Sequence, residues 1–522
     1  MPPATEQELL EKIASLTAKV AELTALNEQL LQAVDRLSRR LFGKSSEQLD
    51  PNQLELLLGE LGRAPAPPPP PAAPDLAPPA RAKRPAPPRR DRIPPNLPVT
   101  IVTIDPPEVL ANPDAFRRIG EEVTERIRFT PGVFSVLRQV RGKYVDIDNP
   151  VAKPVIAPLP PCLLERGTAD ATFVAEIIYN RFALHLTYYR LAEMFVALGA
   201  DFDRKTLCSH AMLGADWLQI IYREIQAEHR RCRYRQFDET PIAYLKPGSG
   251  KAQQGYFWVS NIPGGSVFYQ WRAGRDAGGA AELFGPDPEL PAQPTEEQIN
   301  ELVHLIQCDA YSAYGTWAAK RPWIRLAGCN AHARRKFTEA TAQNPRLVGW
   351  ILRQYALLYQ IETRLREAKA GPALRAAVRA SESRMIFERL GKVFRRLALR
   401  TSILPKSQLG KALTYVIGNW ERLGRFLTDG RIEIDNNLLE NAMRPTKIGA
   451  KNWLFIGREE AGQSAAVLYT IVENCRRLGI DVREYLIDVL TRLPAMKADE
   501  AVALTPANWL KAKQAAAKAK AA

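Results

Sequence analysis

Two strand-length segments of this chain each carry an aspartate within apolar and aromatic sequence, and the two aspartates are 71 residues apart. They are residues 235–244 (RQFDETPIAY), which contain Asp238, and residues 302–311 (LVHLIQCDAY), which contain Asp309. Their length and composition are typical of β-strands. Taken alone, an aspartate at a strand end is more often a cap or turn residue. The two aspartates indicate a functional site only if a third acidic group can lie beside them.

That third group lies in residues 431–458 (RIEIDNNLLENAMRPTKIGAKNWLFIGR). Asp435 precedes good helix-forming residues, which predicts a helix over residues 436–443 with Asp435 as its N-cap. Pro445 is expected to end this helix, because its ring excludes the preceding residue from helical geometry. Glu440 then lies on the flank of a short amphipathic helix.

Carboxylates from two strands and a helix can converge on a pair of divalent cations. Such cations, roughly 3.5–4 Å apart, stabilise the attacking and the leaving oxygen in phosphoryl transfer. Hard oxygen ligands favour Mg²⁺ or Mn²⁺ over zinc. We therefore expect Asp238, Asp309 and Glu440 to form a site with two metal ions that cuts and joins DNA.

Three other carboxylates compete for places in this site. Glu433 and Asp435 are alternatives to Glu440, although Asp435 is explained more simply as the helix cap. Glu239 follows Asp238 directly, and adjacent residues on a strand point to opposite faces, so only one of the two can join the site. We choose Asp238.

Apolar residues recur over residues 9–41 in alternating steps of four and three, which is the heptad spacing. β-branched residues at a and Leu at d favour a parallel two-stranded coiled coil, in which Asn27 fixes the register at some cost in stability. A long amphipathic helix packed on its own domain is the alternative, but the sustained 3.5-residue period disfavours it. Within a zipper region of residues 1–50, we expect a homodimer or higher oligomer through Ile13, Leu16, Val20, Leu23, Asn27, Leu30, Val34 and Leu37.

Three regions separate the zipper from the first aspartate. Residues 51–98, rich in Pro and in Arg and Lys, are expected to be an extended basic linker. Residues 99–160 are expected to form a small β module, with strands over residues 123–129 and 134–145. Residues 161–232 are expected to be helical.

The helical region permits two interpretations. Gly199 is expected to end its second helix and Asp203 to cap the third. One interpretation is a helix-turn-helix that directs Arg204 and Lys205 toward DNA, and the other is a purely structural three-helix stretch.

Residues 233–340 and 429–480 are expected to be two parts of one catalytic core. Three antiparallel strands, then a helix and a further strand, are what a ribonuclease-H-like α/β sheet requires. The 131 residues between Asp309 and Glu440 are too many for a direct connection, and residues 341–428 contain no strand-like run, so they are predicted to be a helical insertion. Residues 481–522 form a C-terminal segment, whose end, from residue 495, is expected to fray.

The net charge of +15 and the pI of about 9.5 favour a polyanionic partner. The basic residues His332, Arg334, Arg335 and Lys336 either hold a scissile phosphate or merely start an exposed helix. Trp453 either stacks on an unpaired base or belongs to the core. The predicted DNA contacts, in addition to Arg204 and Lys205, are His332, Arg334, Arg335, Lys336, Arg444, Lys447, Lys451 and Trp453.

The six scattered cysteines contain no CxxC pair, which argues against a disulfide framework and against structural zinc. Cys329 and His332 lack two further zinc ligands nearby. With no signal peptide and no apolar run of eighteen residues, the expected protein is soluble, cytoplasmic and not embedded in a membrane.

Six motifs make the chain resemble the insertion-sequence-66 family of DDE transposases over nearly its full length. They are FDETP (237–241), CDAYSAY (308–314), CNAHARRKF (329–337), DGRIEIDNNLLENAMRP (429–445), GAKNWLFIG (449–457) and SAAVLYTIVENCRRLGI (464–480). The zipper followed by LFGKSSEQL (41–49) is also similar to that family. The chain departs from the family in lacking zinc-finger cysteines in the small module and in carrying Ala450 where a basic residue is common.

The resemblance implies that Asp238, Asp309 and Glu440 are the catalytic triad. It also implies cleavage at the terminal inverted repeats of a mobile element and transfer of the freed 3′-OH to target DNA, near the nucleoid. Two protomers would pair two ends, with small element-encoded accessory proteins as further partners. The alternatives are a dimeric DNA-binding protein whose acidic site is unused and a plain metal-dependent DNA nuclease.

Overall fold

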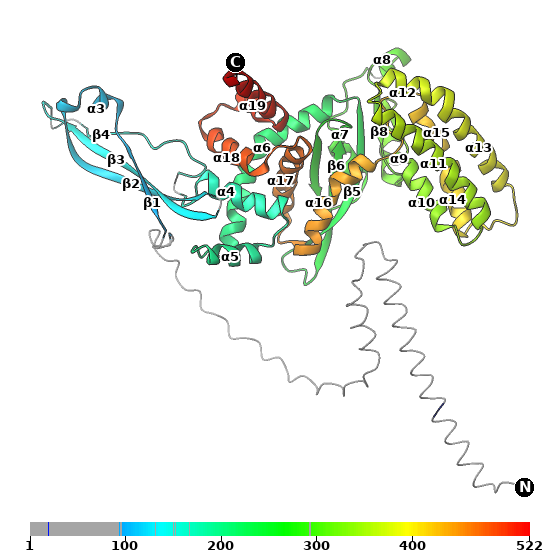
Figure 1. Ribbon diagram of the computed structural model, residues 1–522, viewed down its shortest axis with the longest axis horizontal. Helices are drawn as coiled ribbons and strands as arrows, with labels where there is room; N and C mark the ends of the chain where they lie inside the picture. Colours follow the sequence, from blue (N-terminus) through cyan, green and yellow to red (C-terminus); the bar gives the residue numbers. More distant parts are fainter. Residues whose placement is uncertain are drawn as a thin grey trace, which may run out of the picture. The chain divides into compact units, whose positions relative to one another are not determined.

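The computed structural model describes Lys19, Ile93 and residues 97–521, with residues 131, 150, 152, 166, 292 and 293 excepted. The predicted zipper positions and most of the Pro-rich linker lie outside the described residues. From Ile93 on, the described chain belongs to one compact unit, Ala86–Ala522. It is a mixed α/β protein with many helices and two mixed sheets (Figure 1).

The smaller sheet is built around a long hairpin. Its strands are β1 (Val99–Ile104), β2 (Phe116–Thr130), β3 (Val133–Asp146) and β4 (Val155–Ile156), in the order β1-β3-β2 with β4 on β3. Both predicted hairpin strands are present and are longer than predicted. Gly132 turns the hairpin with φ of 84°, which residues with a side chain rarely adopt. The short helices α3 (Pro107–Ala111) and η2 (Pro113–Ala115) connect β1 to β2.

An aromatic cluster fastens the tip of this hairpin to the next helices. Phe134 of β3 packs edge to face on Phe173 and Phe195, with ring centroids 5.6 and 5.0 Å away. These two rings belong to α4 (Ala171–Ile178) and α5 (Tyr188–Ala197), which are separated by the π-helical turn η3 (Tyr179–Ala183). The Asp203 side chain caps α6 (Arg204–Arg231), as predicted. At 28 residues, α6 is much longer than a recognition helix requires and buries residues along its whole length.

The larger sheet has six strands in the order β7-β6-β5-β8-β9, with β10 pairing on β5. The strands β5 (Tyr234–Leu245), β6 (Ala252–Asn261) and β7 (Val267–Arg272) are antiparallel, whereas β8 (His304–Gln307), β9 (Ile324–Ala327) and β10 (Phe455–Ile456) run parallel to their partners. Connecting helices are α7 (Ala277–Phe284), α8 (Glu296–Glu301) and α9 (Ser312–Ala319).

Helices cover both faces of this sheet. Trp258 points to the face on which α7 and α9 lie, since its ring is 5.9 Å from that of Tyr314 and directly beneath Gly279. Its neighbour Phe257 points to the other face, 5.8 Å from the ring of Tyr469 in α17 (Glu460–Arg477). This alternation decides which acidic side chains can meet the helix that carries Glu440.

That helix, α16 (Asn437–Trp453), contacts β5 and β6. The prediction that Pro445 ends it is wrong, because α16 continues through the proline to Trp453. Pro445 has no N–H to donate to the Asn441 carbonyl one turn back, and side chains bond to the next two carbonyls of the helix. The Tyr269 hydroxyl donates to the Ala442 carbonyl, and the Thr446 hydroxyl donates to the Met443 carbonyl at 2.7 Å.

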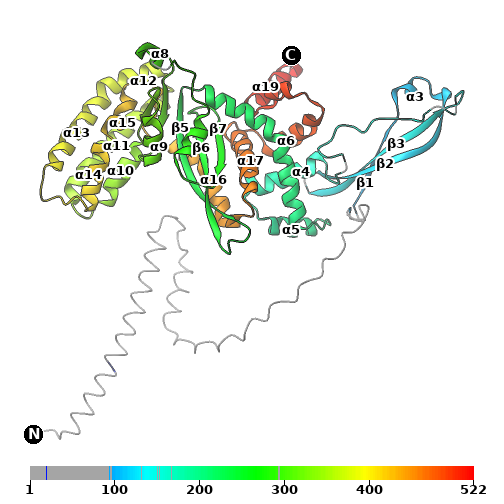
Figure 2. The same ribbon diagram turned by 180° about the vertical axis from the view of Figure 1, so that it is seen from behind.

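A group of helices follows α10 (Asn330–Glu339) in the chain and precedes α16, and it lies beside α9 and α10 in both views (Figures 1 and 2). We call residues 345–427 the helical block. They form α11 (Pro345–Glu367), α12 (Pro372–Val378), η4 (Arg379–Ser383), α13 (Arg384–Ala398), α14 (Gln408–Gly418), α15 (Trp420–Gly424) and η5 (Arg425–Leu427). The block contributes most of a second hydrophobic core, separate from the core under the large sheet.

The prediction that the C-terminal segment frays from residue 495 is wrong. It forms α18 (Val482–Arg492), η6 (Leu493–Ala495), η7 (Ala498–Leu504) and α19 (Pro506–Ala521). Buried Trp509 anchors α19 and donates through its indole N–H to Asp488 at 2.7 Å. No helix in the described part of the chain is both long and apolar enough to cross a membrane.

Candidate active site

The register between β5 and β8 brings the two aspartates to one edge of the sheet. Gln236 is directly opposite Gln307 in this parallel pair. Asp238 lies two residues after Gln236 on the same face of β5, and Asp309 lies two residues after Gln307, just past the end of β8, which is about 4.8 Å from β5. Both side chains are half-buried. The sequence interval of 71 residues thus becomes a short distance in space.

Asp238 and Glu239 point to opposite faces, as predicted. Asp238 pairs with Val259 and faces the side of α16 and α17, whereas Glu239 pairs with Trp258 and faces α7 and α9. Glu239 is buried there and is held by Arg275 and by the Tyr314 hydroxyl, both at 2.5 Å. Its partners leave Glu239 no free oxygen for a ligand, so Asp238 is the available carboxylate.

The electrostatics of Asp238 link the three predicted acids. Burial, then the neighbouring charges of Glu239, Asp309 and Glu440, raise the pKa of Asp238 well above its usual value. Each of these carboxylates is close enough to disfavour a further negative charge. Crowding of acidic groups is relieved when a cation binds between them, so the electrostatics suit a cation.

Glu440 lies in the first turn of α16, where the helix dipole favours a negative charge. One of its oxygens is 3.8 Å from Nε2 of His332 and the other is 3.8 Å from a guanidinium nitrogen of Arg335. The first oxygen is buried and has no hydrogen-bond partner among the described residues. Glu440 therefore faces the basic helix α10 with unused ligand capacity.

The three acids do not close into a complete ligand shell. Among the residues that the structure describes, no group of three or more His, Cys, Asp or Glu side chains could hold a metal ion as it stands. Backbone N–H groups already bond to some of the carboxylate oxygens that would bind a metal. Asp238 accepts a hydrogen bond from Glu239 N and Asp309 accepts one from Tyr311 N, both at 2.8 Å. The donors themselves, carboxylate oxygens with one orphaned oxygen on Glu440, fit a hard divalent cation.

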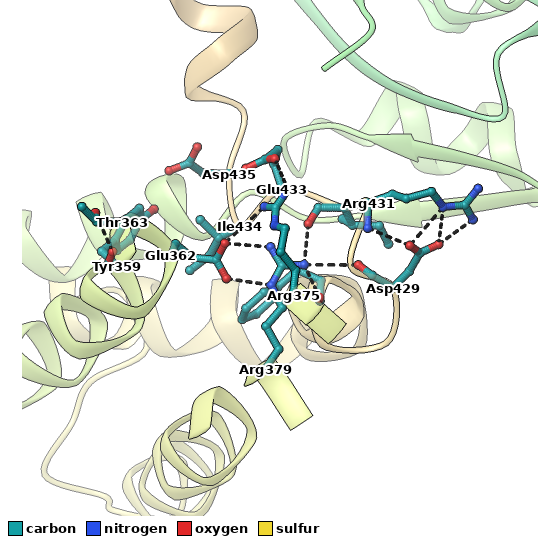
Figure 3. Close-up of polar contacts among 12 residues, drawn as sticks. Tyr359, Glu362, Thr363, Arg375, Arg379, Asp429, Arg431, Glu433, Ile434 and Asp435 are labelled. Atoms are coloured by element: carbon teal, nitrogen blue, oxygen red, sulfur yellow. Dashed lines mark hydrogen bonds and ion pairs between the residues drawn. The ribbon is translucent and has the colours of Figure 1, made fainter. Parts of the chain in front are cut away.

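The competing acids Glu433 and Asp435 are engaged elsewhere (Figure 3). Glu433 forms an ion pair with Arg375 at 2.7 Å. Asp435 is buried and accepts from the backbone and side-chain nitrogens of Asn437 at 3.0 and 2.8 Å. The N-cap position of α16 is Asn436, so the assignment of Asp435 as N-cap is wrong by one residue.

Buried amides, which the sequence analysis missed, hold the segment leading into α16. Gln307 donates to the carbonyls of Glu433 and Gly328 at 2.7 and 3.1 Å, and Gln236 donates to the Asp435 carbonyl at 2.9 Å. The Tyr234 hydroxyl donates to Gln307 at 2.6 Å. The signal was available, because each glutamine interrupts apolar sequence two residues before an aspartate.

The predicted DNA-contacting residues fall into separate groups. Arg334, Arg335 and Lys336 are exposed on α10, and His332 is half-buried beside Glu440. Arg204 and Lys205 are exposed at the start of α6, on a different part of the fold.

The basic residues of α16 reach solvent, and one of them also bonds to the fold. Arg444, Lys447 and Lys451 are exposed. Lys447 donates to the Pro241 carbonyl at 3.0 Å, and burial lowers its pKa. Trp453 packs on the main core with the Arg181 guanidinium 4.7 Å from its ring, which favours the core alternative.

Comparison with known proteins adds to this geometry. The model of the family described as "Transposase IS66 family" matches residues 166–464, a range that includes all three acids. The chain belongs to the IS66 transposase family. A second model, described as "Transposase C of IS166 homeodomain", matches residues 29–102.

Relatives of this IS66-family chain occur in Sinorhizobium fredii (strain NBRC 101917 / NGR234). The uncharacterized protein y4jD is 30% identical over 527 residues, which cover 95% of this chain and 97% of y4jD. The uncharacterized protein y4qI is 30% identical over 419 residues, which cover 75% and 72%. The similarity therefore extends over both the acidic site and the helical block.

Proposed function

We propose that this IS66-family chain is a DNA transposase that cleaves phosphodiesters at the terminal inverted repeats of an insertion sequence and joins the freed 3′-OH to target DNA. The observation that carries the proposal is the electrostatic cluster of Asp238, Asp309 and Glu440 at one edge of the large sheet. The strand order supports it, because three antiparallel strands followed by two parallel ones match a ribonuclease-H-like sheet.

The acids have distinct structural supports. Asp238 is fixed by its strand and Asp309 by the turn that follows β8, while Glu440 depends on the amide-held segment before α16. Together they would hold Mg²⁺ or Mn²⁺, which supplies Lewis-acid stabilisation of the attacking and leaving oxygens. His332 and Arg335 face Glu440 and are placed to bind a phosphate that enters beside it.

The partners follow from this chemistry. The substrate is double-stranded DNA, which the exposed cations of α10 and α16 contact through phosphates. A homodimer or higher oligomer through the predicted zipper would pair two transposon ends. Small element-encoded accessory proteins are further partners, and we place the protein in the cytoplasm, at the nucleoid.

A cleavage and strand-transfer assay tests the proposal. The full-length protein is incubated with DNA that carries candidate ends, with Mg²⁺ or without divalent metal. Mg²⁺-dependent nicks and joined products are expected from the wild type and neither from Asp309→Asn. Asp201→Asn, which alters an exposed aspartate, is the matched control and should leave both products unchanged.

Each alternative function has its own outcome. Equal products from wild type and Asp309→Asn, or tight binding without products from either, would favour a DNA-binding protein with an unused acidic site. Hydrolysis that Asp309→Asn abolishes, without any joined product, would identify a plain nuclease.

A further inference from the structure

The positive charge of this chain is concentrated in the helical block, residues 345–427. The block contains seventeen Lys or Arg residues against five Glu and no Asp, a balance of +12. The whole chain carries +15, so all the other residues together contribute only +3. The basicity that indicates a polyanionic partner therefore belongs mainly to a segment without any of the three acids.

Within the block, α13 separates its charge from its apolar side chains. Phe387, Leu390, Phe394 and Leu397 are buried in the second core, where α13 contacts α11 and α14. The remaining surface exposes a cationic face, which we define as Arg384, Arg389, Lys392, Arg395, Arg396 and Arg400. Glu388 is the one acidic residue of this helix.

The cationic face is not explained by ion pairing within the fold. In the described part of the chain, no carboxylate forms an ion pair with any of its six cations, whereas Arg375 and Arg379 of the same block are paired with buried Glu362. Lys392 and Arg396 are four residues apart, and like charges at this spacing destabilise an isolated helix. Glu388, four residues before Lys392, is the one acidic side chain of this helix against six cations, so most of the positive charge of the face is left for a partner outside the chain.

The dimensions of α13 suit a DNA backbone. Its fifteen residues extend over about 22 Å, which corresponds to about six base pairs along duplex DNA. Arg predominates on the face, and its planar guanidinium binds phosphate oxygens in pairs. Contacts of this kind fix DNA in position without selecting its sequence.

We propose that the cationic face of α13 is a second DNA-binding surface, which holds the phosphate backbone of double-stranded DNA without sequence preference. The proposal rests on the proposed function in that DNA is the substrate of the acidic site. The helical block is then a positioning element for DNA beyond the scissile phosphate. It separates the tasks of the molecule, because the acids perform the reaction while α13 retains the duplex.

Salt-dependent binding tests this proposal in the full-length protein. The variant Lys392→Gln/Arg395→Gln/Arg396→Gln removes three charges from the face. Lys497→Gln/Lys511→Gln/Lys518→Gln is the matched control, because it removes three exposed charges of the C-terminal segment that no ion pair in the described residues uses. Binding to a labelled duplex of arbitrary sequence is measured by fluorescence anisotropy between about 50 and 200 mM salt.

The α13 variant is expected to weaken binding at least about tenfold at the lowest salt and to reduce the slope of log K against log salt by about 3. The control should change affinity less than about twofold. An unchanged slope for the α13 variant, with an unchanged thermal melting profile, would overturn the proposal. If the variant melts early, Lys392→Glu/Arg396→Glu decides instead, and wild-type affinity from that variant would equally overturn it.

The outcome is separable from that of the cleavage assay. If Asp309→Asn abolishes cleavage while the α13 variant binds DNA like its control, the transposase proposal stands and the α13 surface falls. If no protein cleaves DNA but the α13 variant loses the salt-dependent contacts, the reverse holds.

Discussion

Asp238 combines a chemical role in the proposal with a cost to stability. Its raised pKa means that the folded protein binds a proton at Asp238 more tightly than the unfolded chain does. Its contribution to stability is therefore complete below the unfolded pKa of about 4 and is lost as pH rises through the folded pKa. Asp238 should therefore contribute less to stability at pH 7 than at pH 4.

Asp238→Asn is accordingly expected to raise Tm at pH 7 by about 2 °C while abolishing cleavage, because it removes charge repulsion and keeps the shape. The gain should shrink as pH falls toward 4. Mg²⁺ should raise the Tm of the wild type, by binding only the folded state, and leave Asp238→Asn unchanged. Differential scanning calorimetry at several pH values, with and without Mg²⁺, measures these shifts.

Glu239→Gln provides the contrast of opposite sign at the adjacent position. The Glu239 carboxylate is buried and paired with Arg275, so its neutralisation should lower Tm. A lower Tm for Asp238→Asn as well would contradict the view that repulsion dominates at that position.

At the residue scale, the sequence was sufficient to predict that Asp238 and Glu239 point to opposite faces, because strand alternation is a local rule. The sequence did not reveal the hydrogen-bond partners of Gln236 and Gln307, which are 199 and 126 residues away. A buried polar residue must be paired, but a sequence does not name its partner. The roles of the acids stay predictions, although their electrostatic proximity is a property of the fold.

At the level of elements, a buried ion-pair network joins the helical block to the segment before α16 (Figure 3). Arg379 and Glu362 are fully buried and form two hydrogen bonds of 2.7 and 2.8 Å. Arg379 also donates to the carbonyls of Phe426 and Ile432 at 2.9 and 2.8 Å. One guanidinium thus fixes both α11 and the turn that follows η5.

Arg379→Met is expected to cost about 3–5 kcal/mol of stability, because it leaves Glu362 charged and buried with a weakened set of partners. Glu362→Met/Arg379→Met should cost less than the single change, since the uncompensated charge is gone, although orphaned carbonyls remain. Chemical denaturation of both variants measures the difference. Cleavage should fall in each, because the segment that positions Glu440 loses its anchor.

Arg364→Met is the control for this pair. Its partner Glu382 is exposed, and such a pair contributes about 0–1 kcal/mol. If Arg364→Met lost as much stability as Arg379→Met, burial of the ion pair would not explain the cost of breaking it. A double variant less stable than Arg379→Met would contradict the view that the buried charge of Glu362 causes the loss of stability.

Element boundaries were predictable where local chemistry dominates. Asp203 caps α6, as expected from its own sequence. Pro445 was misjudged because the Tyr269 hydroxyl that supports the helix comes from 173 residues away. The fraying predicted for the C-terminal tail was likewise wrong because the Trp509 indole bonds to Asp488 of α18. Tertiary partners, which propensities omit, override local stop signals.

At the scale of the whole molecule, the predicted zipper would give the acidic site its biological use. Transposition needs two DNA ends held together, and two linked protomers raise the effective concentration of the second end. The heptad residues lie outside the described part of the chain, so this step rests on their period alone.

Leu16→Pro/Leu30→Pro tests that arrangement. Each proline costs about 3 kcal/mol within a helix, so the variant is expected to be monomeric by analytical ultracentrifugation where the wild type is dimeric or larger.

Since the acidic site and α13 belong to a separate compact unit, the monomer should retain the salt dependence of DNA binding and Mg²⁺-dependent nicking of single ends. Joint processing of two ends should fall by a factor of about 100, because the avidity of linkage is lost. Ala66→Pro/Ala73→Pro, placed in the Pro-rich linker, also introduces two prolines but changes no heptad residue, and it should behave as wild type. A monomeric wild type, or a proline variant that still pairs two ends, would mean that the protomers associate through the DNA or through the described unit instead of through the heptads.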